Sequence, residues 1–166
     1  MEQELVLGTN TLITSKTDLR GRIIYCNQDF IDYAGLSEGE LINKPHNIIR
    51  HPDMPKTVFS LLWDYVKSGK EIFAFVKNKS KDNQFYWVFA NVTPSLDIQN
   101  NIIGYYSVRR KPNPKAIQVI SDIYAQMVEV EKTQGITGGS QILKNLCEKF
   151  NKPYNQVIFD LQKDHK

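Results

Sequence analysis

PHNIIRHPDMPKTVFSLLW, residues 45–63, is the stretch around which the chain is organised. Its first half, from His46 to Met54, is turn-rich and contains two histidines, an arginine and an aspartate. These polar groups lie between apolar segments, and burying them without hydrogen-bond partners is costly. They therefore either satisfy one another or hold a ligand, and we favour the ligand. In the alternative, Asp53 caps the following helix and Arg50 pairs with it.

The second half of this stretch predicts an amphipathic helix. Pro55 suits the first position of a helix, and apolar residues then recur at helical spacing until Gly69. These residues are Val58, Phe59, Leu62, Trp63 and Val66. One face of the helix must be buried, so its aromatic residues are first of all candidates for the core.

Upstream, the pattern predicts a β-hairpin and two short helices. Residues 12–15 and 22–26 are β-prone runs joined by a turn with Asp and Gly. Asn27 stands where an N-cap is wanted before the helix QDFIDYAG. The second helix, SEGELI, opens with Ser37 and Glu40 at the spacing of a capping box.

Downstream of Gly69 the hydrophobic period changes from 3.6 to 2, which predicts strands at residues 71–78, 85–94 and 102–110. Polar segments separate these strands and suit the turns of an antiparallel meander. Two early strands, a helical middle and three late strands predict an α+β domain, a five-stranded antiparallel sheet with helices on one face.

Alternation assigns the side chains of the late strands to two faces. One face carries modest side chains and is expected to line a pocket; in the middle strand it consists of Tyr86, Val88, Ala90 and Val92. The other face carries Trp87 and large phenylalanines, and we expect an apolar outer surface that needs a cover or a partner.

Composition narrows the functional classes. The 166 residues suffice for one well-buried core plus an appendage. The net charge of +3 comes from basic residues interleaved with acids, so no nucleic-acid-binding face is expected. Cys26 and Cys147 lie in apolar-patterned segments, as expected for reduced thiols of a cytoplasmic protein. No long apolar run is present, so we expect a soluble protein that is neither exported nor membrane-spanning.

Pro112 and Pro114 mark the end of the predicted sheet domain. Beyond them apolar residues from Ala116 to Val130 recur at spacings of three and four, which predicts a coiled-coil-like seam, either packed within the chain or joining protomers. GITGGS, residues 135–140, predicts a hinge before two more short amphipathic helices. The expected organisation is an N-terminal cap at 1–10, the sheet domain at 11–111 and a helical extension at 112–166.

Several segments resemble the FAD-binding PAS domain of the Aer-type aerotaxis and energy-taxis receptors. They are YCNQDF (25–30), PHNIIRHPDMP (45–55), VKN (76–78), FYWVFANVTP (85–94) and IGYYSVRRKP (103–112). The predicted order of elements is also that of a PAS domain. Because the membrane anchor, HAMP domain and signalling helix bundle of an Aer-type receptor are missing, the chain resembles the stand-alone PAS subunit of a bipartite energy-taxis system (CetB type).

The resemblance implies that six residues support flavin binding or its readout: Asn27, Arg50, His51, Asp53, Phe59 and Asn78. Their chemistry agrees in part, because Arg50 and His51 suit the phosphates of FAD, and Asp53 could orient them or brace the helix start. Asn78 is both donor and acceptor and suits the polar edge of the flavin ring. Asn27 is equally explained as an N-cap, and Asn78 as the end of a strand.

Three aromatic residues, Phe59, Trp63 and Tyr86, are candidates for the apolar walls of the pocket. Arg109 falls where light-sensing PAS relatives have a flavin-contacting glutamine. The chain also departs from its relatives, which often carry Pro-Trp and then a glycine where this sequence has EIFA, residues 71–74. No cysteine lies in the polar turn, so the flavin-thiol adduct of LOV photoreceptors cannot form. No GxGxxG motif is present, so a dinucleotide would not occupy a Rossmann site.

The leading hypothesis is a cytoplasmic redox sensor for energy taxis. Reduction of FAD would change the hydrogen bonds at its polar edge, and the sheet would relay this to a membrane-bound HAMP or methyl-accepting signalling partner that recruits the chain to the membrane. Flanking helices are a candidate homodimer interface, whereas direct membrane insertion is not expected. No nucleophile with its base and orienting group is evident, so an enzyme is not expected. Two alternatives are a haem-based gas sensor, with His46 or His51 as axial ligand, and a cofactor-free interaction module.

Overall fold

The predicted hairpin opens the sheet, after a short strand that the sequence did not indicate. The computed structural model describes residues 1–163, in which β1 (Gln3–Glu4) precedes the hairpin of β2 (Ile13–Thr17) and β3 (Ile23–Cys26). In the turn the Asp18 carboxylate accepts backbone hydrogen bonds, and Gly21 adopts a φ of 79° that suits glycine. The local turn chemistry therefore closes the hairpin as expected.

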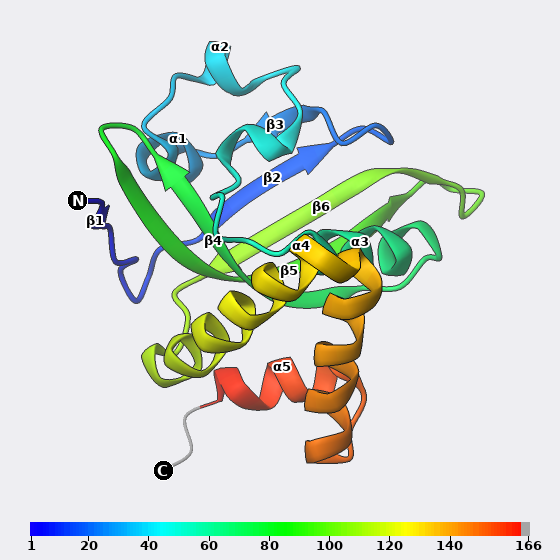
Figure 1. The fold of residues 1–166 in the computed structure, drawn as a ribbon. Helices are drawn as coiled ribbons and strands as arrows, with labels where there is room; N and C mark the ends of the chain where they lie inside the picture. Colours follow the sequence, from blue (N-terminus) through cyan, green and yellow to red (C-terminus); the bar gives the residue numbers. More distant parts are fainter. Residues whose placement is uncertain (164–166) are drawn as a thin grey trace.

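Four helices lie on one face of the sheet, called here the inner face (Figure 1). They are α1 (Gln28–Ala34), α2 (Glu38–Leu41), the 3₁₀ helix η1 (His46–Ile49) and α3 (Lys56–Lys67). Asn27 caps α1, and Ser37 and Glu40 form the predicted capping box of α2. The position of Pro55 differs slightly from the prediction, because it is the N-cap residue of α3 and not the first residue of the helix. Its side chain cannot accept a hydrogen bond from the first N–H groups of α3.

The three late strands complete the sheet: β4 (Ile72–Ser80), β5 (Gln84–Leu96) and β6 (Ile102–Arg110). β5 is central and pairs antiparallel with β4 and β6, while β6 continues to β2 and β3. The sheet is mixed and has six strands, because β1 pairs parallel with the start of β5. The pairing of β6 with β5 ends at Phe89. The same edge of β5 is therefore open at Gln84 and Phe85, where β1 pairs with it.

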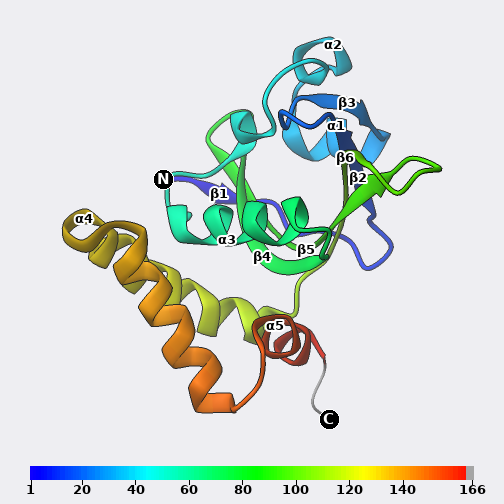
Figure 2. The same ribbon diagram turned by 90° about the vertical axis from the view of Figure 1, so that its right-hand side faces the viewer.

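Two C-terminal helices cover the opposite, outer face of the sheet (Figures 1 and 2). α4 (Pro114–Phe150) crosses this face, and the Tyr124 hydroxyl donates a 2.7 Å hydrogen bond to the Phe75 carbonyl of β4. α5 (Tyr154–Gln162) packs on β4, where the Asn155 side chain accepts a hydrogen bond from a backbone N–H of that strand. The aromatic outer surface predicted from alternation is therefore covered by the chain's own helices.

A kink divides α4 at Gly135, which has φ 61° and ψ −156° and begins the predicted hinge. Before the kink, the buried residues of α4 include Ala116, Ile120 and Met127 of the predicted seam, which packs within the chain. After it, α4 turns back sharply (Figure 2). Within residues 1–163 no helix, α4 included, is both long enough and apolar enough to cross a membrane.

Candidate functional site

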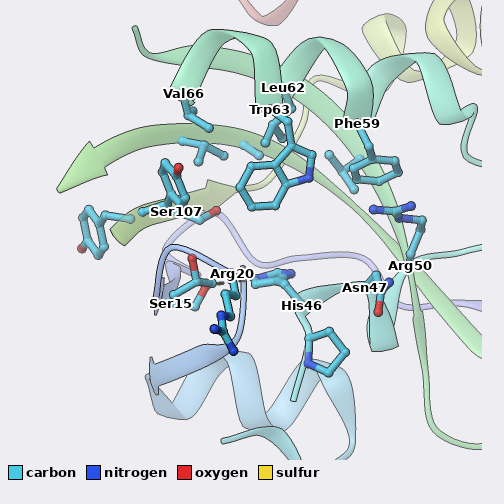
Figure 3. Close-up of a pocket in the computed structure, with 18 of the residues that line it drawn as sticks. Ser15, Arg20, His46, Asn47, Arg50, Phe59, Leu62, Trp63, Val66 and Ser107 are labelled. Carbon is cyan, nitrogen blue, oxygen red and sulfur yellow. Dashed lines mark hydrogen bonds between the residues drawn. The ribbon is translucent and has the colours of Figure 1, made fainter. Parts of the chain in front are cut away.

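A cavity of about 460 Å³ lies between the inner face of the sheet, η1 and α3 (Figure 3). This volume is within the range of about 300–1,000 Å³ that is typical of small-molecule sites. The hairpin turn and the polar turn before α3 form its remaining walls. The two parts of the stretch 45–63 therefore meet at one cavity, the polar turn at one side and the helix at another.

One wall of the cavity is apolar and comes from α3. Phe59, Leu62, Trp63 and Val66 point from this helix into the cavity at the spacing seen in the sequence (Figure 3). The Trp63 ring lies edge-on to Tyr105 of β6, with centroids 5.2 Å apart. The opposite wall is the inner face of β4 and β5, which contributes the small residues Val76, Ala90 and Val92. The result is a slot between the aromatic side chains of α3 and small side chains of the sheet.

Arg50 lies at one end of this slot. It follows η1, and its backbone bridges to Asn78 of β4, which fixes the polar turn against the sheet. Its guanidinium carbon lies 3.5 Å from the centroid of the Phe59 ring, and its Nε is buried without a hydrogen-bond partner. Burial lowers the pKa of the Arg50 side chain. An arginine held in this way offers unused donors to a ligand.

A buried polar triad closes another side of the cavity and consists of His46, Ser15 and Arg109. Arg109 donates from Nη1 to His46 Nε2 at 2.9 Å and from Nη2 to Ser15 Oγ at 2.8 Å, and Ser15 Oγ lies 3.1 Å from His46 Nε2. Burial, and then the charge of Arg109, lowers the pKa of His46 to about 3. The imidazole is therefore neutral, and because a guanidinium only donates, its Nε2 must be the acceptor.

Asn78 also faces the cavity, on the strand next to the polar turn. Its side chain is 4 % exposed and hydrogen-bonds the hydroxyl of Tyr86, the residue opposite it on β5. Tyr86 itself is fully buried behind the lining, and burial raises the pKa of its phenol to about 12. Tyr86 therefore positions Asn78.

Four candidate residues from the sequence lie outside the lining of the cavity: Tyr86, which was expected in its apolar wall, and Asn27, His51 and Asp53. Asn27 accepts hydrogen bonds from the backbone N–H groups of Thr14 and Phe30 and thereby joins α1 to β2. His51 Nε2 lies 2.8 Å from a carboxylate oxygen of Glu2, and His51 Nδ1 accepts from the Asp53 backbone N–H. The Asp53 carboxylate pairs with Lys77 at 2.8 Å, and this hydrogen bond lowers its pKa.

The charge of the lining is one-sided. Arg20, Arg50, Lys67 and Arg109 line the cavity, and within residues 1–163 no aspartate or glutamate does. The sequence indicated no role for Arg20, Lys67 or Ser15, and it indicated His46 only as a member of the polar cluster and as a possible axial ligand. An aromatic slot bordered by cations favours a planar ligand that carries negative charge.

Comparison with known proteins agrees with this architecture. A family model described as the PAS fold matches residues 23–109. The aerotaxis receptor of Escherichia coli is 36 % identical over 123 residues, 74 % of this chain and 24 % of the receptor. A nitrogen fixation regulatory protein of Klebsiella oxytoca is 26 % identical over 96 residues, 58 % of this chain and 19 % of that protein. The chain thus spans a quarter or less of these relatives.

Solved structures show the same fold. The light-state structure of the blue-light photoreceptor Aureochrome1 LOV superposes with a TM-score of 0.61 at 17 % identity, covering 66 % of this chain and 88 % of that one. A Light-Oxygen-Voltage domain studied with a flavin analogue gives 0.58 at 16 % identity, covering 67 % and 83 %. The PAS architecture and the resemblance to aerotaxis receptors are therefore confirmed. Because the family model matches more than half of the sequence, the chain belongs to the PAS-fold family.

Proposed function

We propose that this PAS protein is a redox sensor that binds FAD in the cavity between α3 and the sheet. One observation carries the proposal: the aromatic slot ends at buried arginine nitrogens that have no partner. Within residues 1–163 four buried side-chain atoms lack a hydrogen bond, and three of them, Thr17 Oγ1, Arg50 Nε and Arg109 Nε, belong to residues that line the cavity. Because buried polar groups are normally paired, these atoms suit a ligand with several acceptors.

The residues present fit FAD by chemistry. Phe59 and Trp63 would cover one face of the ring, while Arg50 would pair with the phosphates and Asn78 with the polar edge of the ring. Bound FAD would supply reversible redox chemistry. Asn27, His51 and Asp53 would act from outside the lining, because they hold α1 and the polar turn in place.

The two alternatives fit the site less well. Haem would need a free histidine nitrogen, but both ring nitrogens of His51 are engaged, by Glu2 and by the Asp53 backbone. His46 Nε2 accepts a hydrogen bond from the Arg109 guanidinium, whose positive charge would repel an iron cation at that nitrogen. A cofactor-free module would fill its interior with its own side chains, whereas this chain leaves about 460 Å³ between the sheet and α3. We therefore favour FAD over haem and over an empty interaction module.

The relay we propose runs through the sheet to the C-terminal helices. On β4, Asn78 faces the cavity, whereas the Phe75 carbonyl accepts the Tyr124 hydrogen bond from α4. A change in the hydrogen bonds of Asn78 would thus bias how α4 lies on the outer face. We propose that the output is a protein contact in the cytoplasm, with a membrane-bound HAMP or methyl-accepting signalling protein and a homodimer through the flanking helices, and that no catalysis is involved.

The test compares two arginines. In Arg50→Ala we expect the FAD retained on purification to fall well below the wild-type stoichiometry. The variant loses the proposed partner of the phosphates and the guanidinium that packs on the Phe59 ring. In the matched control Arg22→Ala, which removes an exposed arginine paired with Asp18, FAD content should not change. Equal FAD in both variants would contradict the proposed site.

A further inference from the structure

Arg109 is a buried cation without a buried anion. Its side chain is on β6, where alternation turns Tyr105, Ser107 and Arg109 toward the cavity. The residue is 3 % exposed, and within residues 1–163 it forms no salt bridge with a carboxylate. A buried charge of this kind is normally paired, because removing it from water is costly. The fold therefore maintains an unfavourable arrangement at this position.

The neighbours of Arg109 hold the guanidinium in place without neutralising it. His46 Nε2 and the Ser15 hydroxyl accept its Nη hydrogen bonds, and its charge lies 4.7 Å from the centroid of the Phe30 ring. All three partners are neutral, since burial keeps His46 uncharged. Its Nε is buried and has no partner, and Arg109 is one of the residues that line the cavity. The positive charge and unused N–H donors of Arg109 are thus left for whatever occupies the cavity.

We infer that Arg109, oriented by His46 and Ser15, selects the anionic form of the ring bound in the cavity. This inference rests on the proposed function, because it concerns the same site and the same cofactor. Oxidised flavin is neutral at its ring, and two electrons from dithionite together with one proton from water give a reduced ring with one negative charge. Arg109 therefore favours the reduced state, and by linkage raises the midpoint potential of the bound cofactor.

The test measures the affinity of the full-length chain for oxidised and for dithionite-reduced FAD under anaerobic conditions. We expect wild-type protein to bind reduced FAD more tightly. Arg109→Gln should lower the ratio of the two affinities by about 10-fold to 100-fold, the size expected for a charge-assisted hydrogen bond. Arg109→Lys, which keeps the charge, should retain part of the ratio. The matched control is Arg110→Gln, since Arg110 is the neighbouring residue and is exposed.

A stability measurement separates this role from a structural one. In cofactor-free Arg109→Gln, Ser15 and His46 still lie 3.1 Å apart and can bond each other, so removing the buried charge should leave the thermal midpoint equal to or above that of wild type. A clearly lower midpoint would assign Arg109 to the fold and overturn the inference.

Two further outcomes keep the inference and the proposed function apart. Wild-type protein that binds both forms of FAD equally, or Arg109→Gln with an unchanged ratio, would overturn the inference while leaving FAD binding intact. Wild-type protein that binds neither form would refute the proposed function itself.

Discussion

The N-terminus of α3, the helix that walls the cavity, is capped by a residue 75 positions away. The Glu131 carboxylate on α4 accepts hydrogen bonds of 2.9 Å from the backbone N–H groups of Lys56 and Thr57, and one of 2.6 Å from the Thr57 hydroxyl. Pro55 offers no side-chain hydrogen bond of its own, so Glu131 supplies the cap. Its negative charge also complements the positive end of the helix dipole.

The size of this contribution follows from the groups involved. Losing an N-cap costs about 1 kcal/mol, and leaving the nearly buried Thr57 site unsatisfied adds about 1 kcal/mol. We therefore expect Glu131→Ala to reduce the free energy of unfolding by about 2 kcal/mol. For a chain of this size, that corresponds to a thermal midpoint lower by roughly 4–8 °C. Because α3 carries Phe59 and Trp63, retained FAD should fall as well.

The assay is thermal unfolding followed by circular dichroism, with Glu129→Ala as the matched control. Glu129 lies on the same helix and pairs with Lys132 through side chains that are 74 % and 64 % exposed. Exposed pairs contribute about 0–1 kcal/mol, so the midpoint of this control should stay within a few degrees of wild type. If Glu131→Ala unfolds at the same temperature as Glu129→Ala, the proposed cap between α4 and α3 is refuted.

Three further predictions follow from contacts elsewhere. The pKa of His46 is about 3 in the folded protein and has its ordinary value in the unfolded chain, so between these two values the unfolded chain binds one more proton. The free energy of unfolding should therefore fall as the pH drops from about 6.5 to about 3, by up to ~1.4 kcal/mol per pH unit. In His46→Gln, urea unfolding should show that this dependence has decreased. Gly139→Ala places a Cβ in steric clash with Thr57 Oγ1 and should cost about 1–3 kcal/mol in the same assay, whereas Gly39→Ala, with its nearest atom at 3.9 Å, should be tolerated. Tyr124→Phe removes the hydrogen bond to Phe75 and should cost about 1 kcal/mol, while Tyr25→Phe at an exposed position should cost nothing measurable.

Local signals predicted most of the fold. The helix cap at Asn27, the capping box at Ser37 and the glycine at the kink of α4 each depend on residues only a few positions away, so the local sequence was sufficient to predict them. Strand alternation separated the cavity face from the outer face for the same reason. β1 was missed because it has only two exposed residues, which carry no pattern and pair only because the edge of β5 is open.

The site was predictable only where one element supplies it. Phe59 and Trp63 followed from the periodicity of α3. The partners of His51 and Asp53 are Glu2 and Lys77, which are distant in sequence, so spacing could not show that these side chains bond away from the cavity lining. The triad at His46 was equally hidden, since Ser15 and Arg109 come from strands that pair in the sheet but lie 94 residues apart in sequence.

The central claim is that the cavity below the sheet binds FAD, and the most direct measurement is to identify what the purified full-length chain carries. Denatured protein should release FAD at about one molecule per chain, seen by chromatography and mass spectrometry, with a yellow flavin spectrum before denaturation. Release of a porphyrin with a Soret band, or a colourless protein that takes up no added FAD, would contradict the account.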